Sequence, residues 1–187
     1  MEYTPEVGNA LVQQFYKDPD SFLAAPAPEK KPKQFYHDGA VREVIKREGN
    51  LDEVQKYIVQ HEGFVAGDYN DTKGISTSGV GQTGIYKGKT FKETYDIHKQ
   101  KAKKLVPAFD TLPEQGQKAI MSLIYRGDIE KDHKWLASFN KGEYEKASKE
   151  LLNHKEYIQL KKRKKDTGKD SGIIKRLEEA SEYIKNI

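Results

Sequence analysis

The chain has 187 residues and no cysteine, and its 33 Lys and Arg stand against 29 Asp and Glu. Because 33% of the residues are charged and the mean hydropathy is -0.89, no stretch reaches the roughly 18 apolar residues of a membrane-spanning helix. We therefore expect no membrane insertion. The lack of cysteine excludes a disulfide scaffold, a thiolate metal site and a Cys nucleophile. The length fits one domain with an appendage.

Residues 1–50 are predicted to form an N-terminal helical extension. Thr4 followed by Pro5 is typical of a helix start, and a second helix is expected through Ala40 and Ile45, ended by Gly49. Between them, residues 24–33 (AAPAPEKKPK) hold three Pro and favour an extended linker. The first thirty residues show no secretory signal. Residues 51–187 are then predicted to be a separate domain.

The middle of the chain changes from a helical to a glycine-rich pattern. Asn50 and Glu53 match a capping box for a helix that runs to about Glu62. From Gly63 to Gly88, seven Gly residues separate short runs of Thr, Ile, Val and Tyr. This pattern predicts short strands joined by tight turns.

Helical periodicity returns in the second half of the chain. Thr90 and Glu93 match another capping box, for a helix that ends at Pro107. Apolar spacing predicts four further helices, through 112–124, 135–139, 144–152 and 171–184. The order of helix, small sheet and helices predicts an α+β fold.

Two carboxylates and a hydroxyl group lie at the start of the glycine-rich segment and within it. Glu62 lies at the end of its predicted helix, where the helix dipole disfavours an ionised carboxylate, so Glu62 is suited to hold a proton as a general acid. Asp71 lies in a polar turn beside Asn70 and Gly74, where we expect it to stay ionised, and Thr77 follows on the next strand. Two carboxylates in contrasting environments are suited to acid and base chemistry. Asp68 is a nearby competitor of Asp71.

These residues resemble the phage lysozyme family, the muramidases related to the endolysins of tailed bacteriophages. The family carries Glu-Gly, an Asp nine positions after the Glu and a Thr six positions after the Asp, within a pattern of Tyr, Asp, Gly, Thr, Gly and Gly. Here Glu62 and Gly63 keep that spacing, and the other matching residues are Tyr69, Asp71, Gly74, Thr77, Gly79 and Gly81. The resemblance covers about residues 51–187. The second half matches more weakly, and the segment GIIKRLEEA at 172–180 is similar to a pattern near the family's C-terminus.

The sequence departs from the family pattern at two places. Gln82 stands where the family usually has His. Residues 124–127 (IYRG) replace a motif of an aromatic residue, Asn or Gln, any residue and Gly. Substrate contacts on that helix are therefore not transferred to this chain.

The resemblance implies a lysozyme-like fold, with a small antiparallel sheet lobe beside a larger helical lobe. It also implies hydrolysis of the β-1,4 bond between N-acetylmuramic acid and N-acetylglucosamine in bacterial peptidoglycan. Glu62 would protonate the leaving oxygen, Asp71 would activate a water on the opposite face of the sugar, and Thr77 would hold that water. This arrangement implies inversion, which requires the two carboxyl groups to lie about 6.5 to 9.5 Å apart.

Two other functions stay open from the sequence. One is a virion structural or interaction protein that keeps a weak or inactive lysozyme-like domain, with residues 1–50 docking into a phage tail or capsid. The other is a lytic transglycosylase, which would use Glu62 and need no water held by Asp71 and Thr77. A lysozyme would stay in the virion or in the host cytoplasm before release, and would act on the cell wall in the periplasm.

The remaining signals carry less information. Residues 161–165 (KKRKK) form a run of five basic residues, which is either a solvated face or a site of attraction to an anionic wall polymer or lipopolysaccharide. No aromatic residue lies within this run, so nucleic-acid binding is not expected. The five His residues show no metal-binding spacing, and no nucleotide fingerprint follows a strand, so we expect neither a metal nor another cofactor.

Overall fold

The computed structural model describes residues 32–70, 74–127, 129, 133–168 and 172–187. One compact unit spans Pro32–Ile187. The helix predicted near Thr4 and most of the predicted linker lie outside the described residues. No helix in the part of the chain described here is long and apolar enough to cross a membrane.

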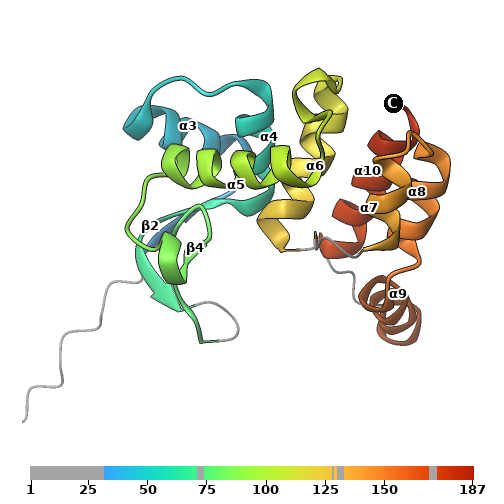
Figure 1. Ribbon diagram of the computed structural model, residues 1–187. Helices are drawn as coiled ribbons and strands as arrows, with labels where there is room; N and C mark the ends of the chain where they lie inside the picture. The colour runs from blue at the N-terminus through green and yellow to red at the C-terminus, as the bar shows by residue number, and fades with distance from the viewer. Residues whose placement is uncertain (1–31, 71–73, 128, 130–132, 169–171) are drawn as a thin grey trace, which may run out of the picture. The chain divides into compact units, whose positions relative to one another are not determined.

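A small antiparallel sheet lies beside a larger set of helices, which confirms the predicted α+β class (Figure 1). The strands are β1 (Lys33–Phe35), β2 (Phe64–Asn70), β3 (Ser76–Gly79) and β4 (Gln82–Thr83), in the spatial order β1-β2-β3-β4. The helices are α3 (His37–Glu48), α4 (Glu53–Glu62), α5 (Phe91–Leu105), α6 (Glu114–Arg126), α7 (Lys134–Phe139), α8 (Tyr144–Leu152), α9 (Lys155–Thr167) and α10 (Gly172–Lys185). Short 3-10 turns lie at Gly84–Tyr86 and Phe109–Thr111.

Capping boxes begin both helices that flank the sheet in sequence. Thr90 and Glu93 cap α5 as predicted, but α4 is capped by Asp52 and Gln55 instead of Asn50 and Glu53. The Asp52 carboxylate accepts from the Gln55 N–H at 2.8 Å, and the Gln55 side chain accepts from the Asp52 N–H at 3.0 Å. The predicted box was wrong because the reciprocal pair starts two residues later.

The turn between β3 and β4 depends on two glycines and one buried glutamine. Gly79 and Gly81 have φ values of 56° and 72°, which favour glycine. The Gln82 side chain accepts from the Val80 N–H at 2.5 Å, and a Cβ added at Gly79 would lie 2.5 Å from the same glutamine oxygen. Gln82, at the position where the lysozyme family usually has His, therefore closes this turn from inside.

The helix α3 is part of the compact unit Pro32–Ile187. That unit begins before residue 50, where the sequence predicted a boundary. Strand β1 pairs with β2, and Ala40 and Val44 of α3 are fully buried. The Glu48 carboxylate also accepts from the backbone N–H groups of Phe91 and Lys92 at 2.8 and 2.9 Å. The last residue of α3 thus caps the first turn of α5.

We expect Glu48→Ala to lower the free energy of unfolding by about 1–2 kcal/mol, because two N–H groups at the start of α5 lose a charged acceptor. Urea denaturation followed by circular dichroism measures the change. Glu43→Ala on the same helix is the matched control, since it removes only a surface ion pair with Arg47 and should cost less than about 0.5 kcal/mol. Equal losses in the two variants would contradict a capping role for Glu48.

The helix α6 lies between the two groups of elements. It packs against α4 and α5 on the side of the sheet and against α10 on the side of α7 and α8 (Figure 1). Most of α6 is buried, including Ala119, Ile120 and Met121, which have no exposed surface. Side chains at the ends of α4, α6 and α10 can therefore meet near the sheet.

Candidate functional site

Glu62 is the last residue of α4, as predicted, and its side chain is 22% exposed. The helix ends there because Gly63 follows with a φ of 75° and its N–H donates to the Val59 carbonyl. A Cβ at Gly63 would lie 3.0 Å from the Phe35 carbonyl oxygen of β1, so the strand passes close to this turn. The backbone thus fixes the direction in which Glu62 leaves the helix.

Arg176 of α10 holds the Glu62 carboxylate. Its Nη2 donates to Glu62 Oε1 at 2.5 Å, and its Nε donates to the Ser122 hydroxyl of α6 at 2.7 Å. The Arg176 side chain is only 10% exposed. A guanidinium with two fixed partners cannot rotate freely, so it presents a defined donor to Glu62.

The second carboxylate oxygen of Glu62 faces the sheet. A Cβ added at Gly81, in the turn between β3 and β4, would lie 3.6 Å from Glu62 Oε2. Because Gly81 has no side chain, this oxygen is left beside open backbone. Glu62 therefore lies where α4, α10 and the β3–β4 turn come together.

Thr77 lies on β3 and is buried, with 3% of its surface exposed. Its hydroxyl donates to the Ile75 carbonyl at 2.9 Å, and its backbone is in register with Tyr69 and Thr83. The hydroxyl proton is thus engaged, and the oxygen can act as an acceptor. The structure gives no direct contact between Thr77 and Glu62 among the described residues.

Asp71, the predicted partner of Glu62, lies outside the described residues. Its competitor Asp68 is described: it lies on β2 with an exposed side chain and forms an ion pair with Lys87 Nζ at 2.9 Å. Lys87 also donates to the Ser76 hydroxyl at 2.6 Å. Asp68 is therefore engaged in linking the strands to the segment after β4.

An aromatic stack connects the sheet side with α6 near Glu62. The ring of His98 on α5 lies 4.9 Å from that of Tyr86 and 4.3 Å from that of Tyr125. The Tyr125 hydroxyl is buried and has no hydrogen-bond partner in the described part of the chain. Burial raises the pKa of Tyr125, and the negative charge of Glu62 raises it further. Tyr125 is therefore a protonated, unused donor close to Glu62.

His98 takes part in this stack as a neutral ring. Burial lowers its pKa, although its hydrogen bond with the Thr94 carbonyl at 2.8 Å acts in the opposite direction. Its ring is stacked against that of Tyr125. His98 helps to position Tyr125.

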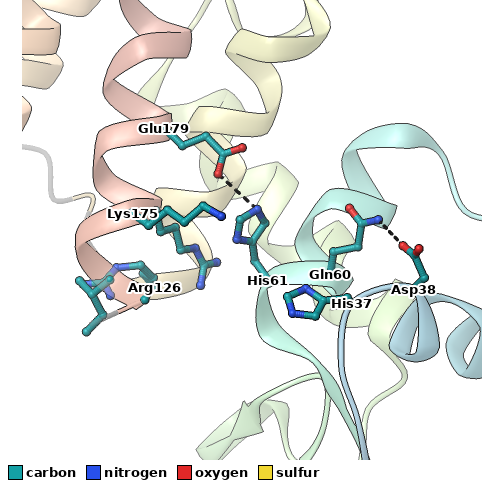
Figure 2. A pocket seen from close by; sticks show the side chains of 10 residues that line it. His37, Asp38, Gln60, His61, Arg126, Lys175 and Glu179 are labelled. Carbon is teal, nitrogen blue, oxygen red and sulfur yellow. Dashed lines mark hydrogen bonds and ion pairs between the residues drawn. The ribbon is translucent and has the colours of Figure 1, made fainter. Parts of the chain in front are cut away.

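A pocket of about 630 Å³ lies on the other side of Arg176. Its lining comes from α3, α4, α6 and α10, and includes His37, Asp38, Gln60, His61, Lys175 and Glu179. Figure 2 shows His61 between Glu179 and Lys175 of α10 on one side and His37 and Asp38 of α3 on the other. Arg176 lines this pocket and also contacts Glu62, so the pocket lies directly behind the candidate acid.

His61 and Glu179 face each other in this pocket. Their Nε2 and Oε2 atoms lie 3.5 Å apart, and Tyr183 donates to the other Glu179 oxygen at 3.1 Å. Partial burial lowers the pKa of His61, while the charge of Glu179 acts in the opposite direction. This pair supports α4 from behind and leaves Glu62 free to face the sheet.

Sequence reasoning singled out Glu62 and Thr77 as candidates but not the residues that hold Glu62. Arg176 lies beside Leu177 in the buried stripe of α10, together with Ile174 and Ala180. A charged residue at a buried position of an apolar stripe is the signal that could have identified it. Ser122 and Tyr125 gave no comparable signal.

The described residues hold no group of three or more His, Asp or Glu side chains that could bind a metal ion. The polar groups around Glu62 are instead one guanidinium, one serine and one tyrosine hydroxyl. This set is suited to holding a carboxyl group in a fixed position.

No protein-family model matches the chain, and no match is found among curated proteins. The resemblance to the phage lysozyme family therefore stays an expectation from the sequence motif around Glu62.

Proposed function

We propose that the protein is a muramidase that hydrolyses the β-1,4 bond between N-acetylmuramic acid and N-acetylglucosamine in bacterial peptidoglycan. The observation that supports this proposal most directly is the fixed geometry of Glu62, which is held by Arg176 at a junction of helices and sheet and remains partly exposed. A carboxyl group fixed in position beside a short sheet, with one oxygen not bound by Arg176, meets the positional requirement for the acid of a glycoside hydrolase.

In this mechanism the two Glu62 oxygens have different tasks. Arg176 occupies Oε1, so Oε2, beside Gly81, carries the proton to the leaving glycosidic oxygen. The bond from the anomeric carbon to that oxygen breaks as the proton is transferred.

The water would attack the anomeric carbon from the opposite face. We assign its activation to Asp71, which accepts a proton from the water, and its position to Thr77. Because the Thr77 hydroxyl already donates to the Ile75 carbonyl, it would hold the water through its lone pairs. Attack from the opposite face gives inversion at the anomeric carbon.

Product analysis tests this proposal against the two alternatives. Purified peptidoglycan is incubated with the full chain, released reducing ends are counted, and products are identified by mass spectrometry. Muramic acid with a free reducing end supports hydrolysis. A 1,6-anhydro sugar would instead identify a lytic transglycosylase, and no release by a folded protein would favour a structural or interaction role.

The proposed function also implies where the protein acts. Its substrate is the bacterial cell wall, which a phage enzyme reaches either from the virion or from the host cytoplasm after release. Docking into a tail or capsid through residues 1–50 belongs to the first route. Because β1 begins at Lys33, removing residues 1–31 is the deletion that tests docking without disturbing the sheet.

A further inference from the structure

The helix α9 carries a formal charge equal to the net charge of the protein, and it contacts the core through the partly buried Tyr157. It has six Lys or Arg and two acidic residues, so its formal charge equals the +4 of the whole chain. None of its residues is buried. The rest of the chain is therefore balanced in charge, and the basic excess is concentrated on one exposed helix.

One side of α9 is fixed against α10. The Tyr157 hydroxyl and Lys161 Nζ both donate to Glu178 Oε1, at 2.7 and 2.9 Å. Nearer its start, Glu156 accepts from Arg126 of α6 at 3.2 Å. These polar contacts fix α9 on α10 and α6 and leave most of its remaining basic side chains in solvent.

Three cations of α9 are exposed and unpaired. Lys162, Arg163 and Lys165 are exposed, and their side chains form no hydrogen bond or ion pair within the described residues. Lys161 and Lys165 are four residues apart, a spacing at which like charges weaken a helix. A helix that has no buried face and several adjacent like charges is stabilised when an anionic partner binds it.

We propose that the exposed cations of α9, Lys162, Arg163 and Lys165, bind the carboxylate groups of peptidoglycan stem peptides and hold the enzyme on the wall. The inference rests on the proposed function for the identity of the polymer. A lipid bilayer fits less well, because Ile158, 51% exposed, is the only large apolar side chain exposed on α9. Nucleic acid also fits less well, because the one aromatic ring of α9, Tyr157, is bound to Glu178 and is not free to stack on bases.

Binding to insoluble peptidoglycan tests the surface separately from turnover. The full chain carrying Glu62→Gln, which prevents digestion, is mixed with purified sacculi stripped of attached polymers, and the bound fraction is measured by sedimentation. Adding Lys162→Gln, Arg163→Gln and Lys165→Gln should weaken binding about tenfold at low salt. The difference should disappear near 0.5 M salt, where the charges are screened. Gln has a helix propensity close to that of Lys and Arg, so α9 is kept.

A matched control removes the same charge elsewhere. The control variant changes three exposed lysines outside α9 and combines Lys46→Gln, Lys141→Gln and Lys185→Gln. If binding depends on where the charges lie and not on the net charge of the protein, this variant should bind within about twofold of its parent. Sacculi with amidated carboxyl groups should bind all three proteins equally weakly. Equal binding by the α9 and control variants, or no effect of amidation, overturns the proposal.

Two further probes identify the partner. Tighter binding to a DNA duplex, or to vesicles of phosphatidylglycerol and phosphatidylcholine, than to sacculi would overturn the assignment to peptidoglycan. The hydrolysis assay of the unsubstituted chain is scored independently. If binding depends on α9 but no hydrolysis is seen, the muramidase proposal is rejected and the α9 binding surface is retained. If hydrolysis is seen but binding does not depend on α9, the binding surface is rejected and the muramidase proposal is retained.

Discussion

Glu62→Gln is expected to reduce the release of reducing ends from peptidoglycan by about a thousandfold or more, in the upper part of the range for loss of a general acid. The glutamine amide cannot transfer a proton to the leaving oxygen, but its carbonyl oxygen can still accept from Arg176. The change therefore removes the chemistry and keeps the contact that fixes the side chain. The measurement is the initial rate on purified peptidoglycan at matched protein concentrations.

The matched control for this prediction lies on the same helix. Glu53 is exposed on the first turn of α4 and pairs with Lys56 at the surface, so Glu53→Gln should keep the rate of the unsubstituted chain. Thermal unfolding of both variants checks that the fold is kept. If Glu62→Gln turned over peptidoglycan at the original rate, the assignment of Glu62 as the acid would be wrong.

The parts of the fold that sequence predicted well are those set by local chemistry. The Thr90 and Glu93 capping box, the end of α3 at Gly49 and the end of α4 at Glu62 follow from residues within a few positions of each other. The apolar stripe of α6 also predicted its helix and its burial correctly. In each case the signal and the structure lie in the same short segment.

The elements that sequence missed lack such a local signal. The helix α9 has no buried residue, so it shows no apolar stripe for a periodicity search to find. Strand β1 has three residues and exists only because Phe35, Gln34 and Lys33 pair with β2. That residues 32–50 belong to the same compact unit as the later helices has a similar cause, since the Glu48 cap on α5 joins positions more than forty residues apart.

The candidate site shows the same difference between residues that are close in sequence and residues that are far apart. The spacing of Glu62, Asp71 and Thr77 could be read from the sequence because all three lie within one segment. The partner of Glu62 could not, because Arg176 is 114 positions away. Only the packing of α10 on α6 brings the two together, and the buried position of Arg176 in the stripe of α10 marks that residue without naming its partner.

Removing Arg176 is expected to have the largest effect on stability. We expect Arg176→Met to lower the free energy of unfolding by about 2–4 kcal/mol, because it leaves a carboxylate without its cation and the Ser122 hydroxyl without its donor. The value lies below the upper range for buried pairs because Glu62, at 22% exposure, can recover some hydration. Urea denaturation of both chains measures the difference.

A double-mutant cycle separates the Glu62 contact from the rest of the loss. In the Glu62→Gln background, Arg176→Met no longer strands a charge, so its cost should fall by about 1–2 kcal/mol. Ser122→Ala, which removes only the second partner of Arg176, should cost about 1 kcal/mol by itself. If the cost of Arg176→Met were the same in both backgrounds, Arg176 would stabilise α10 by packing alone. Its role in positioning the acid would then have to be abandoned, because a guanidinium that gains nothing from Glu62 cannot hold Oε1 in place.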